Sequence, residues 1–540
     1  SRISPKLGSI STIIKIHDCT VVQNHSSRTN TAPRSHRFRV AISGPFAPGQ
    51  IFIGRAIIPH ELDITMTTSH IICPVALQAR YRPHAPAVVA PARTWTFADL
   101  EARIRTAQQA LQQDTQLQGA SIGLLPRRDV QTLAWVWAGW RERRRMVLVN
   151  RRWTPAERAE ALQMAGAATC LADDDDALPA AAPVAVYPRS RRAEDASVQA
   201  RAYASTLQLQ GDATVIFTSG STGQPKGVVH AWRSHFYSAR GAARVMPLRP
   251  TDCWALSLPL YHIGGLAIVM RAALAGAVVA LLDDPVHDWT TRRITHGSLV
   301  ATQLKRLLAA TTGPPPPWLR GLLVGGGPVP EGLLDEAHAR GWPVHTTYGS
   351  TEMASQVTTT PPEASRETLA TAGHVLPHRE LMVRDTGELA VRGPTRCRAY
   401  LTPTGRTQPF DAQGWLGTGD VGHLDAEGRL HITGRVDHQF ISGGENIQPE
   451  TVERALQALP QVARAVVVPV PDEEFGARPV AFVEPAPGTA FAPGCYRTGL
   501  QGRLARFKHP DRYLLWPDDL PNCMKTDRTA LKKRAQQACD

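Results

Sequence analysis

The chain has 540 residues, which is too long for one ordinary compact domain and long enough to bury a substantial core. Apolar residues make up 43% of the chain and charged residues 20%, as is typical of soluble globular proteins. The formal charge is +13, of which residues 1–65 carry +5, but the sequence contains no basic motif interleaved with aromatic residues. The charge therefore favours anionic small-molecule substrates over a nucleic-acid partner.

Cysteine usage and hydropathy narrow the class of protein further. The eight cysteines are dispersed, with no CxxC pair and no Cys/His cluster at metal-ligand spacing, which favours a reducing, cytoplasmic compartment over a structural zinc site. The most apolar run, residues 263–282, contains Arg271 and three glycines. It predicts a buried helix followed by a core strand, and no integral membrane segment.

Patterned sequence begins near Met66, because residues 1–65 show no sustained amphipathic period. A transit peptide is one interpretation of this arginine- and serine-containing stretch. We favour the alternative that Met66 is the true start and that residues 1–65 are an extraneous or disordered extension. The predicted domains are then 66–435 and 436–540.

Strand-like and helix-like segments alternate between residues 207 and 349. In chain order we predict strands at 212–220, 253–262, 278–284, 321–327 and 343–349, and helices at 264–277, 301–311 and 330–341. Short apolar runs separated by helices predict βαβ units and a parallel sheet. Ligands bind at the carboxyl ends of such strands, where the glycine-rich loops after Phe217, Val324 and His345 would lie.

The pattern changes after Arg435. A helix at 452–460 and adjacent strands at 463–470 and 478–485 predict a separate small α+β domain. The expected fold class is therefore α/β: a large N-terminal domain with mostly parallel sheets and flanking helices, plus a small mobile α+β C-terminal domain.

The run TSGSTGQPKGVVH, residues 218–230, predicts a phosphate-binding loop. It is not a Walker A loop, because Pro225 and Gly227 stand where that motif needs glycine and a Mg²⁺-binding hydroxyl. Hydroxyl side chains alternate with glycines and precede a lysine, so the loop offers O–H and N–H donors and one positive charge to an anion. The residues concerned are Thr218, Ser219, Gly220, Ser221, Thr222, Gly223 and Lys226.

This run resembles the phosphate loop of the adenylate-forming superfamily, which contains acyl- and aryl-CoA ligases, peptide-synthetase adenylation domains and luciferases. Three further elements are similar to family motifs in the same order: YGSTE at 348–352, GWLGTGDVG at 414–422 and GRVDHQFISGGENIQPETVE at 434–453. Members activate a carboxylate with ATP as an acyl-adenylate, and a thiol then displaces AMP. The resemblance implies ATP, Mg²⁺ and CoA as ligands.

The resemblance also implies a role for each matching residue. Thr218–Gly223 and Lys226 would bind the β- and γ-phosphates, Thr351 the α-phosphate and Glu352 the Mg²⁺ ion. Tyr348 and the Gly325–Gly327 turn, with Gly326 at its centre, would flank adenine. Asp420, assisted by Arg435, would bind the ribose hydroxyls; Asp437 would be the hinge, and Gly443 and Gly444 would line the pantetheine tunnel. Lys525 would bridge the carboxylate and the α-phosphate, although Met524 replaces the glycine usual before it.

Several stretches resemble the o-succinylbenzoate–CoA ligase branch, notably SLPLYHIGGLAIVMRAALAG, YGSTEMASQV and ENIQPETVERAL. Its substrate keeps one ionised carboxylate, which needs a cation or several donors when buried. His262 is predicted as a pocket or thiol-gate residue, and Arg271 and Ser355 as substrate contacts; alternatively, the head of Arg271 reaches the surface.

Two other functions stay open at this stage. The chain could be another acyl- or aryl-CoA ligase, or a nucleotide-binding protein without catalysis. The sequence does not determine whether the protein forms a homo-oligomer.

Overall fold

The computed structural model describes residues 12–16, 19–23, 70–173, 176, 178–179, 182–189, 205–219, 225–282, 288–289, 292–442, 445–520 and 527–539. The chain divides into two units, residues 1–63 and 64–540. In the first, β1 (Thr12–Ile16) pairs antiparallel with β2 (Cys19–Gln23), a hairpin that the sequence did not predict. In the second, β3 (His70–Ile72) pairs antiparallel with β10 (Thr206–Gln208).

One large sheet has eight strands in the order β23-β22-β12-β11-β7-β6-β8-β9. Its parallel half consists of β11 (Asp212–Ser219), β7 (Arg145–Leu148), β6 (Ser121–Leu124), β8 (Ala167–Ala172) and β9 (Ala185–Pro188). Its antiparallel half consists of β12 (Pro225–Ala231), β22 (Ala399–Thr402) and β23 (Gly405–Thr407). The chain therefore reverses direction between β11 and β12, where the predicted phosphate loop lies.

A second large sheet has nine strands in the order β19-β18-β17-β16-β15-β13-β14-β4-β5. The parallel strands are β17 (Val344–Ser350), β16 (Gly321–Val324), β15 (His296–Leu299), β13 (Cys253–Ala255), β14 (Val278–Ala280) and β4 (Pro86–Val89). Antiparallel strands close both edges: β18 (Ser355–Thr359), β19 (His374–Val375) and β5 (Thr94–Thr96). This sheet places the turns after β16 and β17 at neighbouring strand ends.

The alternating stretch at 207–349 thus contributes strands to both large sheets, which agrees with the expected fold class of mostly parallel sheets. β11 and β12 belong to the eight-stranded sheet, while β13 to β17 join β4 in the parallel part of the nine-stranded sheet. Helix α5 (Trp232–Ala242) separates the two groups of strands in the chain. Strand and helix periods do not reveal such a division, because they carry no information about which strands pair.

Two helices show capping chemistry at one end. At α2 (Phe97–Gln113), Thr96 and Asp99 form a reciprocal capping box. The predicted apolar helix is α6 (Ile263–Ala275), and it ends at Gly276, whose φ of +65° suits glycine. The other helices of this part are α1 (Pro74–Tyr81), α3 (Val130–Arg141), α4 (Pro155–Met164), α8 (Ala301–Ala309), α9 (Glu331–Ala339) and α10 (Arg366–Leu369), with 3₁₀ turns η1 (Thr115–Leu117) and η2 (Thr351–Met353).

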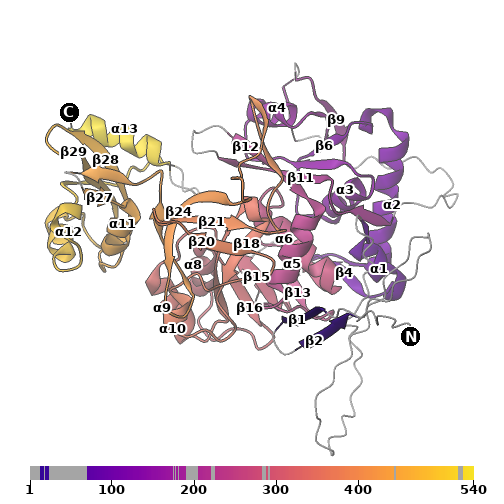
Figure 1. The fold of residues 1–540 in the computed structure, drawn as a ribbon, viewed down its shortest axis with the longest axis horizontal. Coiled ribbons are helices and arrows are strands. Elements are labelled where there is room, and N and C mark those ends of the chain that lie inside the picture. Colours follow the sequence, from indigo (N-terminus) through magenta and orange to yellow (C-terminus); the bar gives the residue numbers. More distant parts are fainter. Residues whose placement is uncertain are drawn as a thin grey trace, which may run out of the picture. The chain divides into compact units, whose positions relative to one another are not determined.

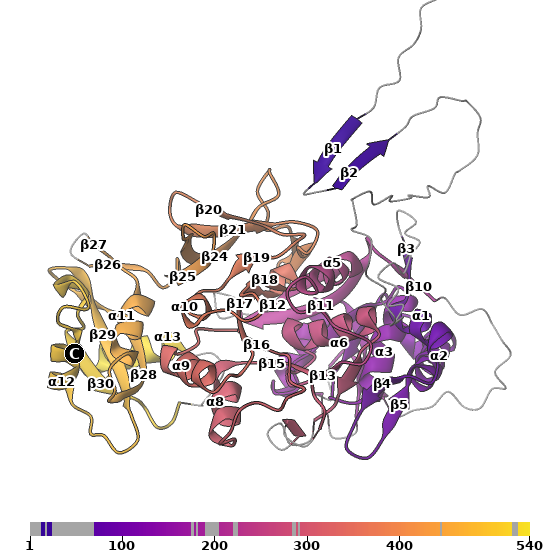
Figure 2. The same cartoon turned by 90° about the horizontal axis from the view of Figure 1, so that it is seen from below.

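The largest hydrophobic core joins both sheets through the helices. It contains buried residues of β6 and β7 from one sheet, of β4 and β14 from the other, and of α2, α3, α5 and α6. Helices α2 and α3 lie side by side in Figure 1, as do α5 and α6 (Figures 1 and 2). The helices therefore pack the strands of both sheets into one body.

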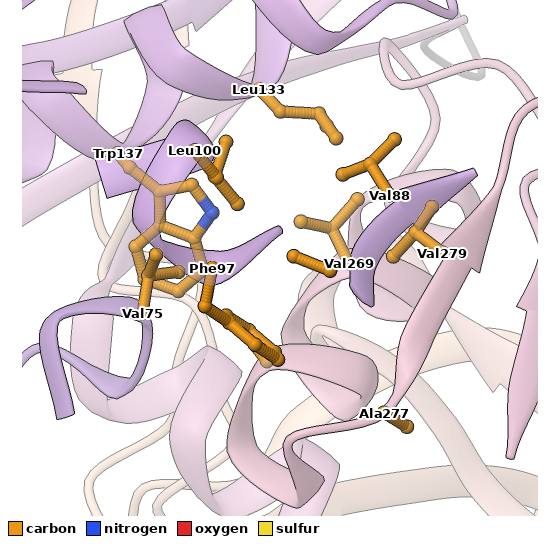
Figure 3. Close-up of a pocket in the computed structure, with 11 residues that line it drawn as sticks. Val75, Val88, Phe97, Leu100, Leu133, Trp137, Val269, Ala277 and Val279 are labelled. Atoms are coloured by element: carbon orange, nitrogen blue, oxygen red, sulfur yellow. The ribbon is translucent and has the colours of Figure 1, made fainter. Parts of the chain in front are cut away.

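A small cavity lies within this core (Figure 3). Its lining is apolar, including Phe97, Trp137, Val269 and Val279 from four different elements. Because it carries no titratable side chain, the cavity offers no chemistry, and we assign it to core packing.

Two smaller sheets follow in the chain. β20 (Glu380–Val383), β21 (Glu388–Arg392), β24 (Leu416–Leu424) and β25 (Leu430–Arg435) form an antiparallel sheet in that order, and β26 (Phe440–Ser442) pairs with β27 (Glu445–Ile447). The C-terminal α+β segment contains β28 (Val462–Asp472), β29 (Gly476–Pro485) and β30 (Arg512–Leu515), with α11 (Pro449–Gln457), α12 (Pro493–Leu500), η3 (Arg506–Lys508) and α13 (Arg528–Cys539). The helix and two adjacent strands predicted here are confirmed.

Candidate active site

The predicted phosphate loop lies between two paired strands. In the register of β11 and β12, Thr218 lies opposite Lys226. The Thr218 hydroxyl is buried without a hydrogen-bond partner among the described residues, so it is suited to receive a polar ligand. Gly220, Ser221, Thr222 and Gly223, and the side chain of Ser219, lie outside the described residues.

Glu352 forms the centre of a cluster of polar side chains next to this loop. Its Oε1 atom lies 3.0 Å from the ammonium nitrogen of Lys226 and accepts a 2.9 Å hydrogen bond from the Tyr400 hydroxyl. The Lys226 ammonium also lies 3.9 Å from the centre of the Tyr400 ring. Burial alone would raise the pKa of Glu352, but Lys226 and Tyr400 outweigh burial and hold that pKa below its ordinary value.

The backbone on either side of Glu352 is held by two further contacts. The ring nitrogen Nε2 of His230 donates to the Thr351 carbonyl over 2.6 Å, and the backbone N–H of Cys397 donates to the Glu352 carbonyl over 2.6 Å. Burial lowers the pKa of His230 to about 4, so its ring is neutral at pH 7. Glu352 thus occupies a rigid turn between β17 and β18.

The carboxylate of Glu352 fits a hard cation such as Mg²⁺, which prefers oxygen ligands. Within the described ranges, no group of three or more His, Cys, Asp or Glu side chains could hold a metal ion. A single carboxylate completed by substrate phosphates and water is the usual arrangement for protein-bound Mg²⁺.

The carboxylate of Asp420 is shared by a phenol and a guanidinium. Tyr348 donates to one oxygen over 2.6 Å, and Arg435 donates to the other over 2.9 Å. Arg435 also bonds both oxygens of Asp437, at 2.7 and 3.1 Å. The predicted ribose residue and the predicted hinge residue are therefore joined through one arginine.

The predicted adenine turn follows β16. Gly326 has φ of +83°, a backbone conformation that disfavours other residues. A Cβ atom at Gly325 would lie 2.6 Å from the Thr347 side chain, so the turn packs closely against β17. This brings the turn beside the strand that carries Tyr348.

Arg271 is buried, contrary to the alternative that its head reaches the surface. Its side chain donates to Gln356 over 2.6 Å and to Ser355 over 3.3 Å, and its guanidinium lies 5.1 Å from the centre of the Trp254 ring. Among the described residues its Nε atom has no hydrogen-bond partner, and burial lowers the pKa of Arg271 to about 10. Within the part of the chain that the structure describes, no carboxylate pairs with this cation.

A second buried cation, Arg379, was not predicted. It donates to the carbonyls of Gln356, Pro377 and Ser238 and to the Ser238 hydroxyl. Burial and the nearby charge of Arg271 lower the pKa of Arg379 to about 9. The region around Ser355 and Gln356 is therefore positively charged.

His262 lies at the start of α6, with its ring 4.8 Å from that of Tyr261. Burial and the charge of Arg152 lower the pKa of His262, so the ring is neutral at pH 7. No contact joins His262 to Arg271; nine residues of helix separate them by about 13 Å along the axis.

Three further predicted residues lie outside the described ranges, in addition to those of the phosphate loop. These are Lys525, Gly443 and Gly444. The structure brings together Thr218, Lys226, Thr351 and Glu352 in one region, and Tyr348, Asp420, Arg435 and Asp437 in another, with Tyr348 linking the two along β17.

Sequence reasoning missed Tyr400, His230 and Arg379. Each makes its contact with a residue at least 23 positions away, so no local pattern indicates it. A strained turn at Ala354 and Ser355, with φ of +54° and +115°, was also missed. Such outliers cluster at functional sites, and this one begins two residues after Glu352.

Comparison with known proteins gives consistent matches. Residues 75–401 match the AMP-binding enzyme family, and residues 451–525 match the AMP-binding enzyme C-terminal domain. The chain is 33% identical over 476 residues to the 2-succinylbenzoate–CoA ligase of Bacillus pumilus (strain SAFR-032), covering 85% of this chain and 96% of that protein. It is 40% identical over 339 residues to the Salmonella typhimurium 2-succinylbenzoate–CoA ligase, covering 63% and 72%.

Solved structures agree with these sequence matches. The o-succinylbenzoate CoA synthetase of Bacillus subtilis in complex with the acyl-adenylate intermediate OSB-AMP aligns with a TM-score of 0.78 at 30% identity, covering 86% of this chain and 99% of that one. The same enzyme in complex with ATP and a magnesium ion aligns with a TM-score of 0.77 at 30% identity, covering 86% and 100%. No helix in the described ranges is long and apolar enough to cross a membrane. With the fold, the motif residues and these matches in agreement, the chain belongs to the AMP-binding enzyme family of adenylate-forming enzymes.

Proposed function

We propose that the protein is an ATP-dependent ligase that activates o-succinylbenzoate as an acyl-adenylate and transfers the acyl group to CoA, a step of menaquinone biosynthesis. A carboxylate oxygen of the acid attacks the α-phosphorus of ATP, and pyrophosphate leaves. The CoA thiol sulfur then attacks the acyl carbon, and AMP leaves. Relatives of this name cover most of the chain, which supports the assignment.

The buried charge of Arg271, which no carboxylate of the described residues pairs, carries the choice of substrate. An ionised group without a counter-charge is costly to bury, so a protein keeps one where a ligand supplies the partner. A dicarboxylate that reacts through one carboxylate supplies such a partner with the other. Ser355 and Gln356, which accept hydrogen bonds from the guanidinium, follow Glu352 closely in the chain. One short segment therefore carries the proposed metal-binding carboxylate and also holds the cation proposed for the second carboxylate of the substrate.

The remaining residues would each bind a different part of the ATP molecule. Glu352 would hold Mg²⁺, which supplies positive charge to the phosphates, while Lys226, Thr218 and Thr351 would donate to phosphate oxygens. Asp420 would accept from the ribose hydroxyls, which requires that Tyr348 and Arg435 share its oxygens with the ligand.

Three assignments in this proposal rest on the motifs. Lys525 would bring the acid's carboxylate to the α-phosphate, and Asp437 would be the hinge of a C-terminal domain that begins near residue 436. The neutral ring of His262 would lie at the thiol entrance. A cytoplasmic location accompanies the proposal, and the oligomeric state stays open.

The test is thioester formation with ATP, Mg²⁺ and CoA on o-succinylbenzoate, benzoate, succinate and medium-chain fatty acids, with AMP and pyrophosphate release measured in parallel. We expect a strong preference for o-succinylbenzoate and loss of adenylation in the Lys525→Ala variant. AMP release with a different acid would support the adenylate-forming reaction but refute o-succinylbenzoate as the substrate. No turnover with any acid would favour the non-catalytic alternative.

A further inference from the structure

The two carboxylate oxygens of Glu352 are used unequally. Lys226 and Tyr400 both contact Oε1, at 3.0 and 2.9 Å. Across the described ranges, no hydrogen bond or ion pair from another residue engages Oε2. One oxygen is therefore committed to the protein, and the other is left for a ligand.

The contacts from His230 and Cys397 do not decide which oxygen of the Glu352 carboxylate is left. His230 and the Cys397 N–H hold the carbonyls of Thr351 and Glu352, which positions the main chain. The carboxylate can still rotate about its terminal side-chain bond, where rotamer preferences are broad. Its orientation depends on the two side chains that contact Oε1 and on the backbone N–H of Glu352 itself, which also donates to the carboxylate.

Of those two groups, Tyr400 is the better anchored. It lies on β22, where it is paired with Val228 of β12, the strand that carries Lys226. Its ring is half-buried, whereas Lys226 ends in a flexible ammonium that the proposed function requires for phosphate binding. When Lys226 moves to a phosphate, the Tyr400 hydroxyl is the remaining contact on Oε1.

We propose that Tyr400 is a positioning residue for the metal-dependent half-reaction. Its hydroxyl holds Oε1 of Glu352 so that Oε2 is presented to Mg²⁺, and its ring face supports the Lys226 ammonium beside the carboxylate. This inference rests on the proposed function, because it assigns Glu352 to the metal ion.

Two variants separate the hydroxyl from the ring. Tyr400→Phe removes only the hydroxyl, and Tyr400→Leu also removes the ring beneath Lys226. Tyr513→Phe is the matched control, since the buried Tyr513 hydroxyl has no hydrogen-bond partner in the described chain. Mn²⁺ binding to the enzyme–ATP complex is measured by electron paramagnetic resonance, and ATP binding without metal by calorimetry.

For Tyr400→Phe we expect about tenfold weaker Mn²⁺ binding, unchanged metal-free ATP binding and an unchanged rate of thioester formation from preformed acyl-adenylate and CoA. Tyr400→Leu should also weaken metal-free ATP binding, and Tyr513→Phe should match wild type. Unchanged Mn²⁺ affinity in Tyr400→Phe overturns the inference, as does an equal loss of metal-free ATP binding.

A separate result would refute the proposed function: the wild-type protein would form no acyl-adenylate with any of the acids. The metal titration tests the role of Tyr400 independently, because the enzyme–ATP complex is titrated without any acid.

Discussion

Replacing Arg271 by methionine should have opposite consequences for folding and for catalysis. Burial lowers the pKa of Arg271 to about 10, a fall from its ordinary value that corresponds to about 3 kcal/mol of cost to the folded, charged form. Arg271→Met removes that cost but leaves Gln356 Oε1 without a donor, which costs about 1–3 kcal/mol. The free energy of unfolding should therefore change little or rise slightly.

The effect on catalysis should be large for a dicarboxylate. Removing one partner of a buried ion pair costs about 3–5 kcal/mol, so kcat/KM for o-succinylbenzoate should fall roughly 10²- to 10⁴-fold. Acids without a second carboxylate never form that pair, and their kcat/KM should stay the same or rise. The assay is steady-state AMP release on both classes of acid, together with chemical denaturation of the free protein.

Two results would refute this reasoning. One is an equal fall for both classes of acid, which would mean that Arg271 supports the architecture of the site. The other is a loss of several kcal/mol in the free energy of unfolding, which would mean that the cation stabilises the fold. Arg271→Lys is the conservative control, which keeps the charge and loses the paired donors to Gln356 and Ser355.

The remaining predictions concern the nucleotide side of the site. Because the pKa of Glu352 is held below its ordinary value, its contribution to stability is present above that ordinary value and lost as the pH falls through the folded one. Lys226→Met should let burial raise the pKa of Glu352, so the acid limb of the pH profile of kcat/KM should move to higher pH; an unmoved or lower limb would contradict this. Thr218→Val should leave the melting temperature of the free protein equal or slightly higher and raise the KM for ATP several-fold, since it removes a buried hydroxyl that has no partner among the described residues. Asp420→Asn should raise the KM for ATP roughly tenfold, measured by pyrophosphate release; an unchanged KM would show that the carboxylate does not contact the nucleotide.

The elements that the sequence predicted well are those whose signal is local. The apolar run with its glycines predicted a helix at 264–277, close to the observed α6, Ile263–Ala275, because the apolar pattern lies within the segment. The strand before the phosphate run, Asp212–Ser219, was predicted for the same reason. The motif residues around Glu352 and Asp420 were found because the resemblance covers contiguous stretches.

What escaped prediction depends on pairing across the chain. Tyr400 reaches Glu352 only because β22 pairs with β12. The sequence of either strand alone does not determine the register in which the two strands pair. Arg271 is buried because α6 packs against β18. The helical period of the sequence does not show which face of α6 packs against another element and which face is exposed. The division of residues 207–349 between two sheets has the same origin.

With the proposed roles of Asp420 and Asp437, the bridge that Arg435 forms between them would link nucleotide binding to the position of the hinge. A ligand that competes for an oxygen of Asp420 changes how strongly the guanidinium is drawn to Asp437, and a change at Asp437 alters the affinity at Asp420 by the same factor. Ribose binding at Asp420 and the conformation of the proposed hinge at Asp437 would then share one coupling free energy. Under the proposed roles, Arg435 by itself would connect the two.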